Sequence, residues 1–175
     1  MERSDRLNAL ETALENEMNE RKFYLAQAER TENALGKSMF LEIANDELEH
    51  YERLKKLHET WKAGKDWPDT VPLTVKQTNV KQVFSSLTAD AADMRRGNDD
   101  DLAALKKAVD FEAKGAAFYR KLSGMVSEPL EKKFFDLLAG MEEEHYRSLK
   151  ETEEYLLDPA AWFRATEHGG GLDGA

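Results

Sequence analysis

Two pairs of acidic and imidazole side chains recur in this sequence at a spacing that suits metal binding. Glu47 and His50 form one Glu-x-x-His pair, and Glu142 and His145 form the other. Residues three apart on a helix project from one face, so each pair can reach a shared ion. A further glutamate lies 30 residues before each pair and could complete the ligand set. The six candidate metal ligands are therefore Glu17, Glu47, His50, Glu112, Glu142 and His145.

Chance alone could produce one such pair, because the chain holds 35 acidic residues among 175. Two of the four histidines have the pattern, however, and both lie in the same context: the earlier glutamate is followed seven residues later by a tyrosine. We therefore favour a metal site over a solvated acidic surface. The other two histidines, His58 and His168, lack the pattern and are expected to be solvated.

The two halves of the chain look like copies of one unit. Sliding the sequence against itself by 95 residues aligns residues 9–59 with 104–154 without a gap, and about one third of the aligned positions are identical. The candidate ligands of the two halves align with one another. Such repetition predicts two similar structural units. Packed about a pseudo-twofold axis, they would bring equivalent polar residues together at one level.

The elements that must position these residues are helices. Four segments place apolar residues at alternating steps of three and four, the pattern of amphipathic helices with one buried face. The first two helices are predicted over roughly residues 5–32 and 36–62. The third should begin after the N-cap Asn98 and end at Gly124, and the fourth should follow the cap Ser127. This predicts an all-α fold, a four-helix bundle of two helical hairpins.

A long connection over residues 63–97 separates the two hairpins and contains a shorter amphipathic stretch around Val80 to Leu87. A crossover of this length suits the connectivity of ferritin-like bundles rather than a simple up-down-up-down order. It could equally let helices exchange between two chains.

We expect one domain over residues 1–158, because no Pro/Gly/Ser-rich linker divides the chain. The remaining residues, 159–175, are expected to form a tail. Its aromatic pair, Trp162 and Phe163, should dock on the bundle, and its glycine-rich end should be loose or contact a partner.

A bundle interior with four glutamates needs compensating positive charge. Unpartnered buried carboxylates are costly, and four of them in one core would repel one another. Two divalent ions would balance them and leave the imidazoles neutral as nitrogen ligands. By the pseudo-symmetry, one ion takes Glu17 with His50, the other takes Glu112 with His145, and the two remaining glutamates bridge. Oxygen and nitrogen ligands suit iron or manganese, and zinc could substitute.

The composition excludes several other classes of protein. Without cysteine the chain has no disulfide, thiolate zinc site or iron–sulfur centre. Its formal charge of -10 and its lack of a basic stripe argue against nucleic acid. No apolar run reaches the roughly 18 residues of a membrane span, and Met1 to Leu10 lacks the apolar segment of a signal peptide. We expect a cytoplasmic protein with no membrane contact.

Two tyrosines are candidates for a supporting role. Tyr24 and Tyr119 lie two turns beyond Glu17 and Glu112 on the same helix faces. They could hydrogen-bond to the site or donate an electron or proton. The alternative is a pair of core tyrosines with satisfied hydroxyls.

The sequence resembles the rubrerythrin branch of the ferritin-like di-iron proteins over about residues 8–157. The motifs that carry the resemblance are ALENEMNERKFY and EIANDELEHYERL in the first copy, and AVDFEAKGAAFY and LAGMEEEHYRSL in the second. The family ligands fall on the same six residues. The resemblance implies two iron ions per chain, reduction of hydrogen peroxide or dioxygen, and a homodimer.

Three departures from the family pattern affect this expectation. Rubrerythrins proper carry a four-cysteine rubredoxin module, so here the electrons should come from an external electron-transfer protein. They also carry an extra glutamate three residues after the third-helix ligand, where this chain has Gly115; Glu20, at the mirror position, is a possible extra ligand. Bacterioferritins bind haem through a methionine directly after the second-helix glutamate, and Leu48 in that place predicts no haem.

Two other functions remain open at this point. The protein could oxidise iron on its way into storage or delivery, which would need a closed shell of many subunits. It could also be an interaction scaffold whose metal site is vestigial.

Overall fold

The structure, a computed structural model, describes residues 3–72, 78–89 and 95–169, and every element within these ranges is a helix. This confirms the predicted all-α bundle. The helices are α1 (Arg3–Arg30), α2 (Ala34–Lys62), α3 (Val80–Thr88), α4 (Asp99–Met125), α5 (Pro129–Leu157) and α6 (Pro159–Gly169).

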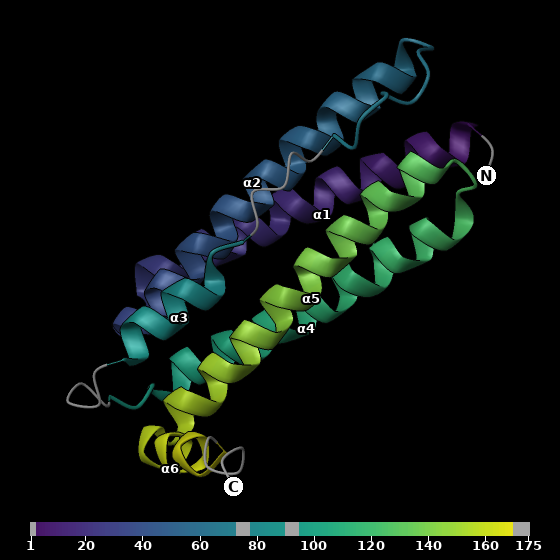
Figure 1. Cartoon of the computed structure of the whole chain (residues 1–175). Helices are drawn as coiled ribbons and strands as arrows, with labels where there is room; N and C mark the ends of the chain where they lie inside the picture. The colour runs from purple at the N-terminus through teal and green to yellow at the C-terminus, as the bar shows by residue number, and fades with distance from the viewer. Residues whose placement is uncertain (1–2, 73–77, 90–94, 170–175) are drawn as a thin grey trace, which may run out of the picture.

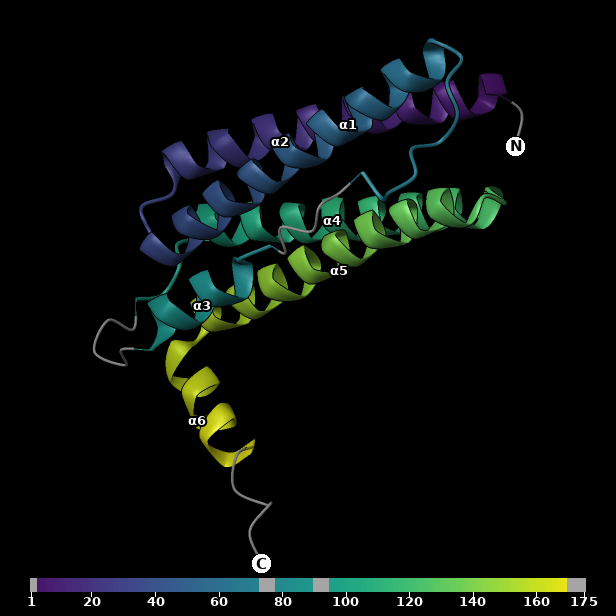
Figure 2. The same cartoon turned by 45° about the horizontal axis from the view of Figure 1, so that its top comes forward.

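Two antiparallel hairpins, α1 with α2 and α4 with α5, lie side by side and form the bundle (Figure 1). Between the hairpins, α1 contacts α4 and α2 contacts α5. The helix α4 begins at the end of the bundle where α1 finishes (Figures 1 and 2). The short helix α3 lies within the connection from α2 to α4 and packs on α2 and α5.

Side-chain caps set the starts of three long helices. The Asn33 side chain accepts a hydrogen bond from the Gly36 amide at 3.1 Å at the start of α2. Asn98 forms the predicted cap of α4 and makes a reciprocal capping box with Asp101. The prediction of Ser127 as the α5 cap is wrong by one residue. The Glu128 carboxylate takes this place, accepting a hydrogen bond from the third amide of a helix that opens with proline.

The apolar core consists of two clusters separated by polar residues. One cluster lies toward the end of the bundle that carries α3 and includes Phe40, Ile43 and Leu105. The other lies toward the start of α1 and includes Leu54 and Leu138. The six candidate ligands lie between the two clusters along the helices. Close-packed apolar side chains therefore border the polar layer on both sides.

The aromatic packing repeats between the two hairpins, as the internal repeat predicts. Tyr24 stacks on Phe40 with ring centroids 6.0 Å apart, and Tyr119 stacks on Phe135 at 6.4 Å. The neighbouring phenylalanine meets each tyrosine edge-on at 5.4 Å in both copies. The pseudo-twofold axis therefore relates side-chain packing as well as the backbone.

The last helix, α6, was not predicted from the sequence, and it turns away from the bundle axis (Figure 2). It begins where the Asp158 carboxylate accepts a hydrogen bond from the Ala161 amide at 3.0 Å. Trp162 and Phe163 dock edge-on against Tyr155, as expected. The expectation of a loose glycine-rich end concerns residues 170–175, which lie outside the described part of the chain.

Within the described ranges, none of the helices has the length and apolar character needed to cross a membrane.

Candidate metal centre

The middle of the bundle contains a layer of buried carboxylates and imidazoles. All six side chains that the sequence selected meet there, and none is more than 2 % exposed. They come from the four long helices: Glu17 from α1, Glu47 and His50 from α2, Glu112 from α4, and Glu142 and His145 from α5.

Their oxygen and nitrogen atoms form two overlapping groups that could each hold one ion. Glu17 and His50 belong to the first group, and Glu112 and His145 belong to the second. Both groups include Glu47 and Glu142, and the ligand atoms of each group lie within 4.8 Å of one another. Each group pairs the same glutamate and histidine as the predicted assignment, and the bridging role of Glu47 and Glu142 stays a prediction.

The distances around the imidazoles follow the same pattern. His50 Nδ1 lies 3.2 Å from a Glu17 oxygen, 3.1 Å from Glu47 and 3.3 Å from Glu142. His145 Nδ1 lies 3.3 Å from a Glu112 oxygen and 3.5 Å from Glu47. The two rings are nearly parallel, with centroids 6.1 Å apart. Each histidine therefore directs one nitrogen into the carboxylate cluster.

Several of these buried atoms have no hydrogen-bond partner among the described residues, and a metal ion would satisfy them. They include both carboxylate oxygens of Glu142, one oxygen each of Glu47 and Glu112, and Nδ1 of His145. Buried polar atoms are rarely left unpaired in native proteins. A donor set of carboxylate oxygens and imidazole nitrogens fits a divalent transition metal well.

The charges in the layer perturb one another strongly. Burial, reinforced by the Glu47 carboxylate, raises the pKa of Glu17 to about 7. Burial also raises the pKa of Glu112 well above its usual value. Burial alone would lower the pKa of each histidine, but Glu17 beside His50 and Glu112 beside His145 raise both well above 6.5. Without metal, protons therefore supply the positive charge that the carboxylates require.

Metal binding should consequently release protons and weaken in acid. Both imidazolium groups must lose a proton to become ligands, and the proton shared near Glu17 must leave as well. At pH 7 we expect each chain to release at least about two protons when its centre is saturated with metal. The affinity for metal should fall steeply as the pH drops below about 7. Calorimetric titration in two buffers of different ionisation enthalpy measures this number. Release of no protons at pH 7 would contradict these raised pKa values.

Both candidate tyrosines contact the centre, and each does so across the pseudo-twofold axis. The Tyr24 hydroxyl donates a hydrogen bond to Glu112, and the Tyr119 hydroxyl donates one to Glu17. Each tyrosine thus binds the glutamate of the other copy. Burial and the adjacent carboxylates raise the pKa of both phenols well above 10, so the hydroxyls stay protonated.

Asp46 is a residue of the centre that the sequence analysis missed. Its carboxylate lies 3.0 Å from His145 Nε2, on the far side of the ring from the cluster. Burial opposes ionisation of Asp46, but the hydrogen bond and the charge of His145 outweigh it and lower the pKa of the carboxyl. An acid in this position fixes the imidazole ring and directs Nδ1 toward the metal. The aligned position of the second copy is Met141, and His50 Nε2 has no hydrogen-bond partner among the described residues.

Replacing Asp46 should therefore weaken metal binding without removing a ligand. In Asp46→Asn the ring of His145 loses a charged partner, and we expect affinity to fall about 10–100-fold. Met141→Leu, at the aligned position of the other copy, is the matched control and should leave affinity unchanged. Competition with a chelator of known affinity measures both. Equal affinities for the two variants would exclude an orienting role for Asp46.

Glu20 and Gly115, the mirror positions at which the chain departs from the family pattern, both lie beside the centre. Burial raises the pKa of Glu20 to about 11, with further contributions from the carboxylates of Glu47, Glu142, Glu112 and Glu17 in that order. The Glu20 side chain is thus close enough for the charges of the carboxylate cluster to raise its pKa, although it belongs to neither ligand group. Its part as an extra ligand stays a prediction.

His58, the other histidine whose side chain the structure describes, belongs to neither group. His58 was expected to be solvated, but its side chain is only 14 % exposed, and Nε2 lies 3.1 Å from the Glu11 carboxylate. The apolar pattern of the sequence does not indicate that His58 lies on the side of α2 that meets α1. The side chain of His168 lies outside the described part of the structure.

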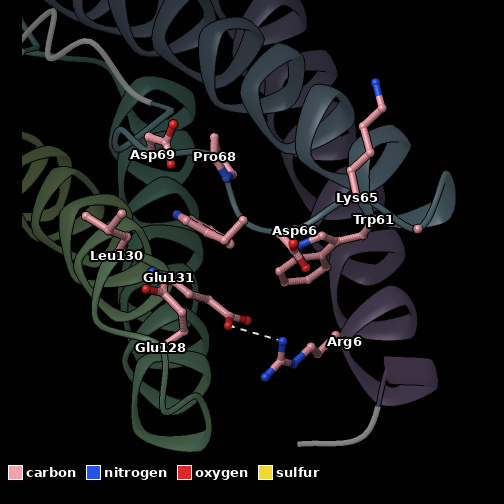
Figure 3. A pocket seen from close by; sticks show the side chains of 11 residues that line it. Arg6, Trp61, Lys65, Asp66, Pro68, Asp69, Glu128, Leu130 and Glu131 are labelled. Carbon is pink, nitrogen blue, oxygen red and sulfur yellow. Dashed lines mark hydrogen bonds and ion pairs between the residues drawn. The ribbon is translucent and has the colours of Figure 1, made fainter.

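A separate pocket lies at the end of the bundle where α1 begins (Figure 3). There Arg6 forms an ion pair of 3.4 Å with Glu131, whose side chain is 1 % exposed, and the guanidinium lies 5.6 Å from the ring of Trp61. Burial raises the pKa of Glu131, and the charge of Arg6 opposes this. The residues of this pocket belong to neither ligand group, so the ion pair is best understood as a structural contact joining α1 to α5.

Comparisons with known proteins agree with this architecture. The family model described as rubrerythrin matches residues 8–153. Among solved structures, a hypothetical protein from Pyrococcus furiosus is similar, with a TM-score of 0.63 and 25% sequence identity. The alignment covers 86% of this chain and 89% of that chain. No match was found among proteins with curated descriptions.

Proposed function

Because the chain belongs to the rubrerythrin family, we propose that it is a di-iron oxidoreductase that reduces hydrogen peroxide or dioxygen with electrons from a separate protein. The observation that carries this proposal is the pair of overlapping ligand groups that share Glu47 and Glu142. Two shared carboxylates hold two ions close together, which suits a reaction that needs two electrons at once.

Residues around the centre would hold protons and exclude water in the proposed reaction. Two ferrous ions, when bound, supply the two electrons that convert hydrogen peroxide and two protons into two water molecules. Tyr24 and Tyr119 hold protons at Glu112 and Glu17, on opposite sides of the layer. The close-packed apolar clusters on either side exclude bulk water and larger reductants.

The sequence carries no cysteine and so offers no iron–sulfur relay of its own. We propose that an external electron-transfer protein reduces the centre and that the working form is a homodimer in the cytoplasm.

Rapid mixing of the ferrous protein with hydrogen peroxide, and separately with dioxygen, tests the proposal. Oxidation within seconds, followed by absorbance and completed by about one peroxide per two irons, is the expected result. The zinc-loaded protein is the control and should not react. Indifference to both oxidants would sink the proposal. Accumulation of iron far beyond two ions per chain, together with a closed shell of many subunits, would favour iron storage instead.

A further inference from the structure

The buried centre needs a route by which metal ions enter, since its six ligands are at most 2 % exposed. Of the described surface pockets, one is lined by a residue at which an added Cβ would contact a ligand. It is a cavity of about 460 Å³ between α1 and α4, with Glu20 on one side and Gly115 on the other. This pocket is distinct from the one around Arg6 and Trp61.

At Gly115 the wall between this pocket and the centre carries no side chain, and the Glu142 carboxylate packs directly against the helix backbone. A Cβ atom at this position would lie 2.6 Å from Glu142 Oε2 and 3.2 Å from the carbon of the same carboxylate. Glu142 is 1 % exposed, and neither of its oxygens has a hydrogen-bond partner among the described residues. An unpaired ligand oxygen therefore lies directly behind a residue that has no side chain to cover it.

The α1 wall of the pocket offers oxygen atoms to a passing cation. Asn16, Asn19 and Glu20 line it at the spacing i, i+3 and i+4, so the three side chains share one helix face. Amide and carboxylate oxygens are ligands that hard divalent cations accept during exchange with water. Glu20 is half-buried, between the exposed Asn19 and the fully buried layer.

Two lysines also line the pocket, and their charges are partly engaged by other groups. The Lys107 ammonium lies over the rings of Phe23 and Phe111, at 5.1 and 5.5 Å from the centroids. The Lys114 ammonium lies 2.6 Å from the Asp110 carboxylate and is largely exposed. The α1 side of the pocket thus faces these lysines with one carboxyl group and two amides.

We propose that this α1/α4 pocket is the route by which ferrous iron reaches the centre, with Glu20 receiving the ion before it passes Gly115 to Glu142. The inference rests on the proposed function only in so far as the centre binds metal. Glu20 acts here on entry, as a transient oxygen ligand, and the resting ligand set stays the six residues of the buried layer.

The first test measures how fast the metal-free protein takes up cobalt(II), by its visible absorbance. Glu20→Gln keeps the shape of the side chain but removes the carboxyl group, which can give up its proton to an incoming cation, and uptake should slow about tenfold or more because an amide cannot do so. Glu15→Gln, an exposed residue of the same helix, is the matched control and should not slow uptake. Both variants should still reach the final cobalt content of the unmodified protein. Equal uptake rates for the two variants would overturn the proposal.

The second test adds a side chain to the wall at Gly115. Gly115→Ala places a methyl group against Glu142, whereas Gly124→Ala on the same helix meets nothing within 4 Å. We expect slower cobalt uptake only in Gly115→Ala, and Lys114→Gln should accelerate uptake, because it removes a like charge from the rim. Circular dichroism checks that every variant is folded.

The two proposals can fail separately in these measurements. Normal cobalt uptake with no reaction toward peroxide counts against the proposed oxidoreductase alone. Rapid uptake that neither Glu20→Gln nor Gly115→Ala slows counts against the route alone.

Discussion

Replacing both shared carboxylates, in the double variant Glu47→Gln with Glu142→Gln, should abolish binding of the metal pair. These two residues belong to both ligand groups, so the change removes two of the three carboxylates from each group at once. Glutamine keeps the volume of the side chain, and the apolar clusters on either side are untouched. We expect metal content, measured by elemental analysis after loading, to fall from about two ions per chain to near zero.

Thermal unfolding should report the same loss. Free metal at about 1,000 times its Kd stabilises a folded protein by about 4 kcal/mol per ion. For a chain of this size, each bound ion then raises Tm by roughly 8–16 °C. The double variant should lose this rise while keeping its helical circular dichroism. Glu49→Gln with Glu144→Gln, a repeat-related pair that belongs to neither group, makes the same charge change and should keep both metal and Tm shift. Unchanged metal content in the first variant would mean that the layer does not bind metal as proposed.

The second large effect is expected at the two tyrosines. Tyr24→Phe with Tyr119→Phe removes the two hydroxyls that donate to Glu112 and Glu17 but leaves every ligand in place. Because these hydroxyls hold the Glu112 and Glu17 carboxyl groups in place for the proposed proton transfers, the oxidation rate of the ferrous protein should fall about 10²–10⁴-fold. Because the contacts are related by the pseudo-twofold axis, each single variant should account for part of the loss.

The matched control for this prediction is Tyr51→Phe with Tyr146→Phe. These tyrosines are also equivalent in the two copies, but Tyr146 is 37% exposed, and neither residue hydrogen-bonds to a ligand in the contacts described. Stopped-flow rates with hydrogen peroxide, at equal iron content, decide the comparison. If both double variants react like the unmodified protein, the tyrosines have only a packing role.

Much of the fold could be predicted because the relevant signals are local. The apolar periodicity fixes the four long helices, and the Asn98 cap fixes the start of α4. The same reasoning does not predict α6, because a proline after a long helix also indicates the end of a helix. Proline is also favoured at the first position of a helix, and Asp158 before it supplies the cap.

The ligands could be predicted for a different reason: each breaks the apolar pattern of its helix in both copies. The partners of those ligands could not, because they depend on how the hairpins dock. Sequence places Tyr24 near Glu17, whereas the packed bundle joins it to Glu112. Asp46 went unnoticed because it sits next to Glu47 in a run of acids, and only the approach of α5 brings it to His145. A comparison of the two copies, in which Asp46 aligns with Met141, would have been the one available signal.

The two copies differ at the positions that surround the ligands. The joined chain can therefore give its two ligand groups different neighbours, which a symmetric pair of hairpins cannot do. A single hairpin that paired with itself could build the same layer of six residues, but any acid placed beside one ion would appear beside the other as well. Here Asp46 and Glu20 each occur once, with Met141 and Gly115 in the duplicate. In the proposed di-iron centre, one ion would therefore be held by a histidine that Asp46 anchors, and the other by a histidine whose Nε2 has no such partner among the described residues. The two ions would then differ in reduction potential, and a one-electron donor would reduce them in two distinct steps.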